Sequence, residues 1–454
     1  MIKSINPATE EEIKSYDEMN FGEIEKIVSS ADKTFNEWRR ISFSERSLKM
    51  KKAGEVLRKN SERFSRLMTE EMGKPILQSR SEIKKCAWVC DYFAENGEGF
   101  LKDIIAKSDA SKSFVTFQPL GVVLAVMPWN FPYWQVFRFA VPGLMAGNAG
   151  ILKHASNVTG CALAIEEVFR EAGFPENLFR TLIISSKYMD KVIELEEIRA
   201  VTLTGSVPAG KAVAAKAGSL IKKTVLELGG SDPYIILEDA DLNAAAETCV
   251  ASRLINGGQS CIAAKRFIIV KKIYNEFRDL FVEKMKKKKM GDPFDESNDL
   301  GPQAKDNLRD DLHKQVQASI KKGAKLSLGG KIPDMKGAYY PPTILENVHK
   351  GMPAYEEELF GPAASLIKAN DETEAIKIAN DSSFGLGAAV FTSDIKKGER
   401  LAREELNAGN CFVNSFVKSD PGLPFGGVKE SGYGRELSFF GIHEFVNIKT
   451  VYVK

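Results

Sequence analysis

The chain has 454 residues, 43% hydrophobic and 27% charged, a composition typical of a folded protein with two or three domains. Its 63 basic and 61 acidic residues nearly cancel, so the charge balance points neither to a nucleic-acid partner nor to an anionic membrane. The sequence has no apolar segment behind a basic start and no stretch of about 18 apolar residues. We therefore expect a cytoplasmic protein without membrane contact.

The first hundred residues are predicted to be helical. Apolar residues three and four apart recur from about Phe21 to Gly99, as on the buried face of an amphipathic helix. The segment SFVTFQPLGVVLAVM (113–127) instead has the β-branched and apolar character of strands, and it ends at the corner PWNFP (128–132). Proline and asparagine at such a corner predict a turn.

Strand and helix patterns alternate after this corner. Residues 150–154, 180–186 and 199–205 have strand character, and each segment precedes a helical pattern. This alternation predicts a mostly parallel sheet with helices on both faces, and ligands of such sheets bind beyond the carboxyl ends of the strands. A second alternating region, from TVLELGG (224–230) to LPFGG (423–427), predicts a second α/β domain.

The segment LTGSVPAGKAVA (203–214) nearly matches the phosphate loop of ATP-binding proteins. Ala212 lacks the hydroxyl that would coordinate Mg²⁺, and Pro208 removes one backbone N–H, so ATP chemistry is disfavoured. A turn-forming glycine at Gly205, the hydroxyl of Ser206 and a helix N-terminus remain, and this arrangement favours a pyrophosphate. An unoccupied strand-to-helix corner is the alternative.

The stretch ILKHASNVTG (151–160) bears on the choice of cofactor. A fold of this class that binds NAD usually places a carboxylate after the second strand, where it contacts the ribose hydroxyls. Here no Asp or Glu follows Lys153 until Glu166. A cation together with Ser156 accepts a 2′-phosphate more readily than a carboxylate would. If the cofactor is a dinucleotide, NAD or NADP, we therefore expect NADP to be accepted.

One of the six cysteines is a candidate nucleophile. The cysteines include no C-x-x-C pair and the four histidines are scattered, so we expect no metal site and no disulfide framework. Cys261 follows Gly257 and Gly258, where the backbone can approach a ligand closely, and a thiolate is a strong nucleophile. The alternative is a small buried apolar side chain, which fits Cys161 and Cys249.

Two polar residues could assist this chemistry. Glu227 lies between Leu226 and Leu228, and burial would raise its pKa toward the range of a general base. The alternative is a carboxylate that bridges two backbone groups at a strand end. Asn130 offers an amide donor to an oxyanion at the end of a strand, unless it only forms the turn between two prolines.

The motifs PWNFP, LTGS, LELGG, GQSC, EEELFGP (356–362) and PFGGVKESGYGRE (424–436) occur in the order and at the spacing found in the aldehyde dehydrogenase superfamily, which the chain resembles over nearly its whole length. The resemblance implies that Cys261 is the nucleophile, Glu227 the general base and Asn130 an oxyanion donor, alongside the backbone N–H of Cys261. The cofactor contacts that we expect are Trp129, Lys153, Ser156, Gly205, Ser206, Leu228, Glu358 and Phe360.

The implied fold is α/β, with a Rossmann-like parallel-sheet cofactor domain, a second α/β catalytic domain and a small β oligomerisation element. We expect the NAD(P)-binding domain at residues 1–102 and 120–226 and the catalytic domain at 227–425. Residues 103–119 and 440–454 are then the oligomerisation strands. An exposed strand at a chain end can pair with another chain, and we expect a homodimer or homotetramer.

The implied reaction is the NAD(P)-dependent oxidation of an aldehyde to a carboxylic acid through a cysteine thiohemiacetal and thioester. Trp134 and Arg138 share one helix face at the predicted site, where the guanidinium could bind a distal carboxylate or pair with a structural carboxylate. The stretches PWNFPYWQVFR and LKHASN resemble a bacterial branch that oxidises succinate semialdehyde. Ser419 would add a weaker contact, while Ile255 stands where some members place a second arginine.

Two alternatives to the oxidation of succinate semialdehyde were considered. The same chemistry could act on another small aldehyde, such as glutarate semialdehyde or lactaldehyde. A catalytically silent protein of the same fold is disfavoured, because Asn130, Glu227 and Cys261 are all present.

Overall fold

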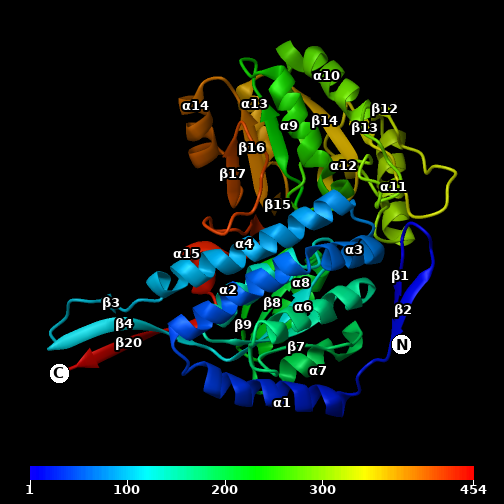
Figure 1. Ribbon diagram of the computed structural model, residues 1–454. Coiled ribbons are helices and arrows are strands. Elements are labelled where there is room, and N and C mark those ends of the chain that lie inside the picture. Colours follow the sequence, from blue (N-terminus) through cyan, green and yellow to red (C-terminus); the bar gives the residue numbers. More distant parts are fainter.

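The structure, a computed structural model, describes residues 1–454 and contains two large sheets, which lie in the lower and upper halves of Figure 1. The lower sheet has six strands in the order β19-β9-β8-β5-β6-β7, all parallel except β19. Its strands are β5 (Val122–Met127), β6 (Ala149–His154), β7 (Phe179–Thr181), β8 (Ile198–Thr204), β9 (Lys223–Glu227) and β19 (Gly432–Tyr433).

The strand order of the lower sheet reverses at β5. The chain moves outward from β5 through β6 to β7, and then returns to place β8 on the other side of β5. Such a reversal leaves a crevice at the carboxyl ends of the two strands, where α/β folds bind their ligands. The stretch predicted as a strand at 180–186 is shorter than expected, because only residues up to Thr181 pair with β6.

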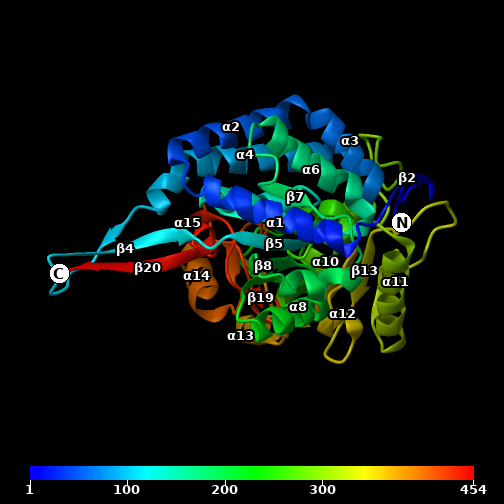
Figure 2. The same cartoon turned by 90° about the horizontal axis from the view of Figure 1, so that it is seen from below.

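Helices cover both faces of the lower sheet, with α6 above the strands and α8 below them in Figure 2. The helix that begins at Phe21 is stabilised by a capping box between Asn20 and Glu23. The helices of this half are α1 (Phe21–Trp38), α2 (Phe43–Lys59), α3 (Ser61–Met72), α4 (Ile76–Phe100), α5 (Trp134–Met145), α6 (Thr159–Glu171), α7 (Met189–Glu194), α8 (Val207–Ser219) and α15 (Ser438–Ile442), with short 3₁₀ turns at Ser156–Val158 and Ser186–Tyr188.

The upper sheet has seven strands in the order β12-β13-β14-β11-β10-β16-β17, and only β12 is antiparallel to its neighbour. The strands are β10 (Pro233–Ile236), β11 (Arg266–Val270), β12 (Lys325–Leu328), β13 (Thr343–Glu346), β14 (Ala363–Ala369), β16 (Gly387–Phe391) and β17 (Asn410–Val413). Its helices are α9 (Leu242–Leu254), α10 (Tyr274–Lys286), α11 (Asp306–Lys321), α12 (Pro353–Glu356), α13 (Glu372–Asn380) and α14 (Ile395–Arg400). The other elements of this half are the short helical turns at Ile255–Gly258, Lys271–Ile273 and Leu401–Glu405 and the two-residue strands β15 (Phe384–Gly385) and β18 (Val428–Lys429).

A third sheet projects from the body as an arm (Figure 2). It consists of β3 (Ile104–Ile105), β4 (Lys112–Pro119) and β20 (Val446–Val453), in the order β20-β4-β3. The antiparallel pair runs from Val446 opposite Pro119 to Val453 opposite Lys112. At the other end of the chain β1 (Ile2–Ile5) and β2 (Glu12–Tyr16) form a hairpin. None of the helices combines the length and apolar character needed to span a bilayer.

Buried apolar side chains form two separate cores, one around each large sheet. Ile262 packs against both cores, and its neighbour Cys261 packs against the lower one. The predicted nucleophile therefore lies at the boundary between the two halves of the molecule, where the carboxyl ends of β5 and β8 also open.

Candidate active site

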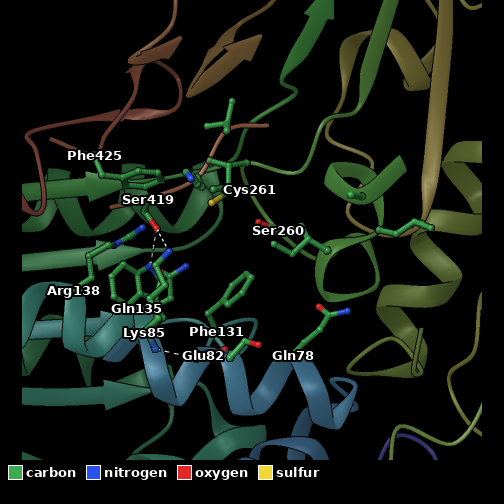
Figure 3. A pocket seen from close by; sticks show the side chains of 18 of the residues that line it. Gln78, Glu82, Lys85, Phe131, Gln135, Arg138, Ser260, Cys261, Ser419 and Phe425 are labelled. Carbon is green, nitrogen blue, oxygen red and sulfur yellow. Dashed lines mark hydrogen bonds between the residues drawn. The ribbon is translucent and has the colours of Figure 1, made fainter. Parts of the chain in front are cut away.

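Cys261 lies where two cavities meet, because it lines both of them. The larger cavity has a volume of about 430 Å³ and is lined by Trp134, Arg138 and Ser419, the three residues predicted to bind substrate (Figure 3). The smaller cavity has a volume of about 270 Å³. The predicted site residues that line it are Trp129, Asn130, Gly205, Ser206, Leu228, Glu358 and Phe360.

A left-handed turn between α9 and β11 presents Cys261. Asn256, Gly257 and Gly258 have φ angles of 55°, 61° and 78°, a region that glycine enters without strain and asparagine tolerates. A side chain at position 258 would collide with the carbonyl group of Gly361. The two glycines noted in the sequence are therefore needed for the turn and for close packing.

Burial raises the pKa of the Cys261 thiol to about 12, although the positive charges of Arg138 and Lys265 oppose this effect. The thiol is consequently protonated at neutral pH in the free protein. Attack on a substrate requires a further positive charge or a nearby base to favour the thiolate.

Glu227 ends strand β9 and is 2% exposed. Neither of its carboxylate oxygens has a hydrogen-bond partner within the protein, so it does not bridge backbone groups, the alternative considered above. Burial raises its pKa well above the ordinary value, with Arg138 opposing the rise and Glu436 adding to it. Its charge is also close enough to influence the pKa of Cys261. These are the properties of a carboxyl group able to take a proton near the thiol.

Asn130 follows β5 and is fixed to the loop that carries Cys261. Its Nδ2 donates to the backbone carbonyl oxygen of Gln259 at 3.1 Å, and its backbone carbonyl oxygen accepts from Nδ2 of Asn256 at 2.7 Å. The side chain is 4% exposed and lines the smaller cavity together with Cys261. The amide is thus held in one place beside the thiol, as an oxyanion donor must be.

The smaller cavity combines aromatic, acidic and helix-terminal groups. The rings of Trp129 and Phe360 meet edge to face, with centroids 5.7 Å apart. Oε1 of Glu358 accepts a hydrogen bond from the backbone N–H of Gly230 at 3.1 Å. Ser206 caps α8 without a side-chain hydrogen bond to that helix, which leaves the first N–H groups of α8 available to an anion.

Gly205 was expected to permit a tight turn, but the backbone at this position does not need a glycine. Its φ angle lies outside the left-handed region, and a Cβ atom there would meet only Cδ2 of Leu203, at 3.5 Å. What the glycine provides is open space at the carboxyl end of β8. Lys211, whose position suggested an ATP loop, is exposed and pairs with Glu430 at 2.7 Å.

Lys153 and Ser156 do not line the smaller cavity. They lie at the end of β6, next to β5. Burial lowers the pKa of Lys153, and the positive charge of Lys305 lowers it further. Two lysines therefore face one region with no carboxylate paired to either of them.

His154 has a structural role at the same strand end. Its two ring nitrogens lie 3.2 Å from the carbonyl oxygen of Met127 and 2.8 Å from that of Pro132. Burial lowers the pKa of the imidazole to about 4, so the ring is neutral at physiological pH. The histidine ties β6 to the corner that carries Asn130.

The larger cavity contains the predicted substrate residues. One of them, Arg138, has a carboxylate partner that could not be identified from the sequence. Arg138 forms a buried ion pair with Glu436, donates from Nη2 to Oγ1 of Thr204 at 3.3 Å, and lies over the ring of Phe425 at 4.5 Å. Of the two alternatives for Arg138, the structure contains the pairing with a structural carboxylate. Arg138 nevertheless also lines the cavity.

Some site residues were not identified from the sequence. One of them is Lys85 on α4, which lines the larger cavity and donates from Nζ to Oγ of the predicted residue Ser419 at 2.8 Å. Gln78 and Glu82 line the same cavity at spacings of four and three residues, so the periodicity of polar residues on this helix was an available signal. Lys265 donates to the carbonyl oxygens of Ser260 and Cys261. Nothing in the stretch NGGQSCIAAKRF (256–267) indicated this role.

Comparison with known proteins agrees with this geometry. Residues 1–451 match the model of the aldehyde dehydrogenase family. The "Probable succinate-semialdehyde dehydrogenase [NADP(+)]" of Synechocystis sp. is 48% identical over 452 residues, which cover 100% of this chain and 99% of the relative. The "Succinate semialdehyde dehydrogenase [NAD(P)+] Sad" of Escherichia coli is 47% identical and covers 99% of this chain and 97% of its own.

Solved structures show the same fold. The crystal structure of succinic semialdehyde dehydrogenase from Streptococcus pyogenes in complex with NADP+ superposes with a TM-score of 0.98 at 36% identity, covering 100% of both chains. The α/β architecture expected from the sequence is thereby confirmed. With a family model that spans the chain, relatives of nearly equal length and a matching fold, this chain belongs to the aldehyde dehydrogenase family.

Proposed function

We propose that this protein oxidises succinate semialdehyde to succinate with NAD or NADP as hydride acceptor. The observation that carries the proposal is the position of Cys261 at the junction of two cavities. One cavity holds cationic and hydroxyl groups that suit a carboxylated aldehyde, and the other holds a helix N-terminus and an acid that suit a nucleotide. A thiol between them can attack an aldehyde carbon held in one cavity, while the other cavity would hold the hydride acceptor.

The residues of the smaller cavity fit a dinucleotide. The first N–H groups of α8 and the hydroxyl of Ser206 suit the pyrophosphate, and the open space at Gly205 allows its approach. Glu358 and Phe360 would hold the nicotinamide ribose and ring. When bound, an oxidised nicotinamide accepts a hydride and places a positive charge near the thiol, which favours the thiolate.

The protein's own groups account for the other steps. Once the thiol of Cys261 has released its proton to water, Sγ bonds to the aldehyde carbon, and the oxygen gains negative charge beside Nδ2 of Asn130 and the backbone N–H of Cys261. Loss of hydride from the carbon leaves a thioester on the cysteine. Glu227 then takes a proton from a water molecule, which attacks the thioester carbon. The C–S bond breaks, the carboxylic acid departs, and the sulfur takes the proton that Glu227 had removed from water.

The end of β6 supports the use of NADP. Lys153 and Lys305 are positive and close enough to affect each other, and Ser156 stands where an NAD enzyme would carry a carboxylate. The relatives from Synechocystis sp. and Escherichia coli are named as NADP(+) and NAD(P)+ enzymes. We assign these residues to the adenosine ribose and its 2′-phosphate.

The three sheets support the proposed domain organisation and assembly. We assign residues 1–102 and 120–226 to cofactor binding and 227–425 to catalysis. The arm contributed by 103–119 and 440–454 exposes Ile104, Ile105 and Ile448, and apolar strands at an edge favour pairing with another chain. The expected assembly is a homodimer or homotetramer.

Initial rates on a panel of aldehydes with NAD+ and NADP+ test the proposal. The panel should contain succinate semialdehyde, glutarate semialdehyde, lactaldehyde and butanal, the last as an uncharged molecule of the same chain length. We expect the highest kcat/KM with succinate semialdehyde and NADP+. A higher value for butanal would contradict the carboxylated substrate, and the absence of reduction with every aldehyde would contradict the oxidoreductase activity.

A further inference from the structure

Lys85 is the unexplained cation of the larger cavity. It projects from α4, where its Nζ donates to Oγ of Ser419 at 2.8 Å and lies 4.2 Å from the centre of the Trp134 ring. Figure 3 shows Lys85, Arg138 and Ser419 together at one side of the cavity, away from Gln78. The ammonium is therefore held at a fixed place in the cavity that receives the substrate under the function proposed above.

The nearest carboxylate on α4 is already engaged. Glu82 forms a buried ion pair with Lys74, and its Oε1 accepts hydrogen bonds from the backbone N–H groups of Tyr133 and Trp134, each at 2.9 Å. Asp420 influences the pKa of Lys85 through its charge but forms no ion pair with it. No carboxylate oxygen lies within ion-pair distance of Nζ of Lys85, which is unusual because buried charges are normally paired.

The other cations of this cavity are accounted for. Arg138 pairs with Glu436, and Lys288 pairs with Asp299 at 2.8 Å. Lys418 is exposed to solvent. The cavity thus contains one uncompensated positive charge that is partly shielded from water, and it belongs to Lys85.

Ser419 adds a free donor at the same point. Its Oγ accepts from Nζ of Lys85 at 2.8 Å and from Nε1 of Trp134 at 2.9 Å. Because both interactions use the oxygen as acceptor, the hydroxyl proton is left to bond elsewhere. An ammonium group has three donors, so two N–H bonds of Lys85 also remain. Several donors and one positive charge converge, and a carboxylate is the group that satisfies such a set.

We propose that Lys85 is a specificity-determining residue, which binds the distal carboxylate of the aldehyde together with Ser419. This proposal rests on the function proposed above. Ile255 lines the same cavity, at the position where some relatives were expected to carry a second arginine. In this chain the second cationic contact comes instead from α4, and Arg138, already neutralised by Glu436, is the weaker attraction.

The test compares Lys85→Met with Lys84→Met, which removes the same charge from an exposed neighbour on the same helix. Each variant is assayed with succinate semialdehyde and with butanal. A hydrogen bond to a charged group of this kind corresponds to roughly 10- to 100-fold in affinity. We expect Lys85→Met to raise KM for succinate semialdehyde by about that factor, and to change kcat/KM for butanal by less than about threefold.

A second measurement does not depend on turnover of the carboxylated aldehyde. Succinate should inhibit butanal oxidation competitively, and its inhibition constant should rise by about the same 10- to 100-fold in Lys85→Met while staying near the wild-type value in Lys84→Met. Lys85→Arg should restore part of the succinate binding. If Lys85→Met folds poorly, Lys85→Gln provides the same loss of charge with more polar character.

The outcomes separate the two proposals. Equal effects of Lys85→Met on both aldehydes would assign Lys85 a purely structural role and overturn the inference. An unchanged succinate inhibition constant in Lys85→Met would do the same, even if the wild-type protein prefers succinate semialdehyde. A wild-type protein that does not distinguish the two aldehydes and is not inhibited by succinate would overturn the proposed substrate, and the role of Lys85 with it.

Discussion

Nζ of Lys265 lies 3.1 Å from Oε1 of Glu358 and donates to the carbonyl oxygen of Cys261 at 2.7 Å. The lysine is 1% exposed; burial lowers its pKa, and the carboxylate of Glu358 opposes that change. One buried ammonium thus connects the acid of the smaller cavity to the backbone of the proposed nucleophile. If Glu358 holds the cofactor as proposed, a change at Lys265 should affect cofactor binding and the thiol together.

Replacing Lys265 with Met should disturb both groups at once. Glu358 loses its cation, and the carbonyl oxygens of Ser260 and Cys261 lose a donor. We expect kcat to fall by at least about 10-fold and the dissociation constant for NADP+ to rise, as measured by fluorescence titration. Glu358→Gln serves as the comparison, because it should weaken cofactor binding and leave the rate of Cys261 alkylation unchanged. A Lys265→Met protein with normal kcat would contradict this link.

Glu227→Gln should separate the two halves of the reaction. Because neither oxygen of Glu227 has a partner in the protein, the amide should fit at little cost in stability. We expect a burst of about one NADPH per active site followed by slow turnover, since hydride transfer precedes the step that needs the base. Mass spectrometry after mixing should detect the acyl-enzyme on Cys261. Slow turnover without a burst would place Glu227 before thioester formation instead.

The positions of several predicted site residues could be inferred from the sequence, because their short motifs fall at the carboxyl ends of strands. Asn130 follows β5, Gly205 follows β8 and Glu227 ends β9, and adjacent parallel strands bring their ends to one edge of a sheet. It could therefore be expected without coordinates that Asn130, Gly205 and Glu227 lie at one edge of the lower sheet. Gly205 was identified for the wrong reason, because its φ angle is ordinary and its value is the space it leaves.

Contacts between distant elements could not be predicted in the same way. Lys85 and Ser419 are separated by 334 positions, and their hydrogen bond depends on how α4 packs against a loop of the other half. The pairing of Arg138 with Glu436 depends on a segment that returns to the lower sheet beside β19. Periodicity shows which face of a helix is buried, but it does not identify the residue that the face meets.

Ser156→Glu should change the cofactor preference. A carboxylate at the end of β6 would accept hydrogen bonds from the ribose hydroxyls of NAD and repel a 2′-phosphate. We expect kcat/KM for NADP+ to fall by about 100-fold, and the value for NAD+ to fall little or rise. Ser156→Ala provides the control for loss of the hydroxyl without added charge. A preference that does not move toward NAD+ would show that the 2′-phosphate binds elsewhere.

The buried pair of Lys74 and Glu82 should contribute asymmetrically to stability. Glu82→Gln leaves the buried ammonium of Lys74 without a carboxylate, with only a neutral amide oxygen and the face of Phe131, 3.9 Å away, so we expect a loss of about 3–5 kcal/mol in the free energy of unfolding. Lys74→Met leaves Glu82 with two backbone donors, those of Tyr133 and Trp134, and should cost less. Urea denaturation of both variants and of the double variant measures the coupling. Equal losses in the two single variants would contradict the asymmetry.

The preference for a carboxylated aldehyde should decline at alkaline pH. Burial lowers the pKa of Lys85 to about 8, and the positive charge of Arg138 adds to this, while Cys86, Glu82 and Asp420 oppose it. Lys85 is therefore charged below that pH and neutral above it, so attraction of the substrate carboxylate is lost as the pH rises.

The measurement is the ratio of kcat/KM for succinate semialdehyde to kcat/KM for butanal, from pH 6.5 to 9.5. Ionisation of Cys261 and Glu227 affects both aldehydes and cancels in the ratio, whereas a group that contacts only the carboxylate does not cancel. We expect the ratio to be constant below about pH 7.5 and to fall above it, by up to about 10-fold per pH unit. In Lys85→Arg the decline should disappear, because a guanidinium stays charged throughout this range. A ratio that stays flat to pH 9.5 in the wild-type protein would mean that the charge of Lys85 does not act on the substrate.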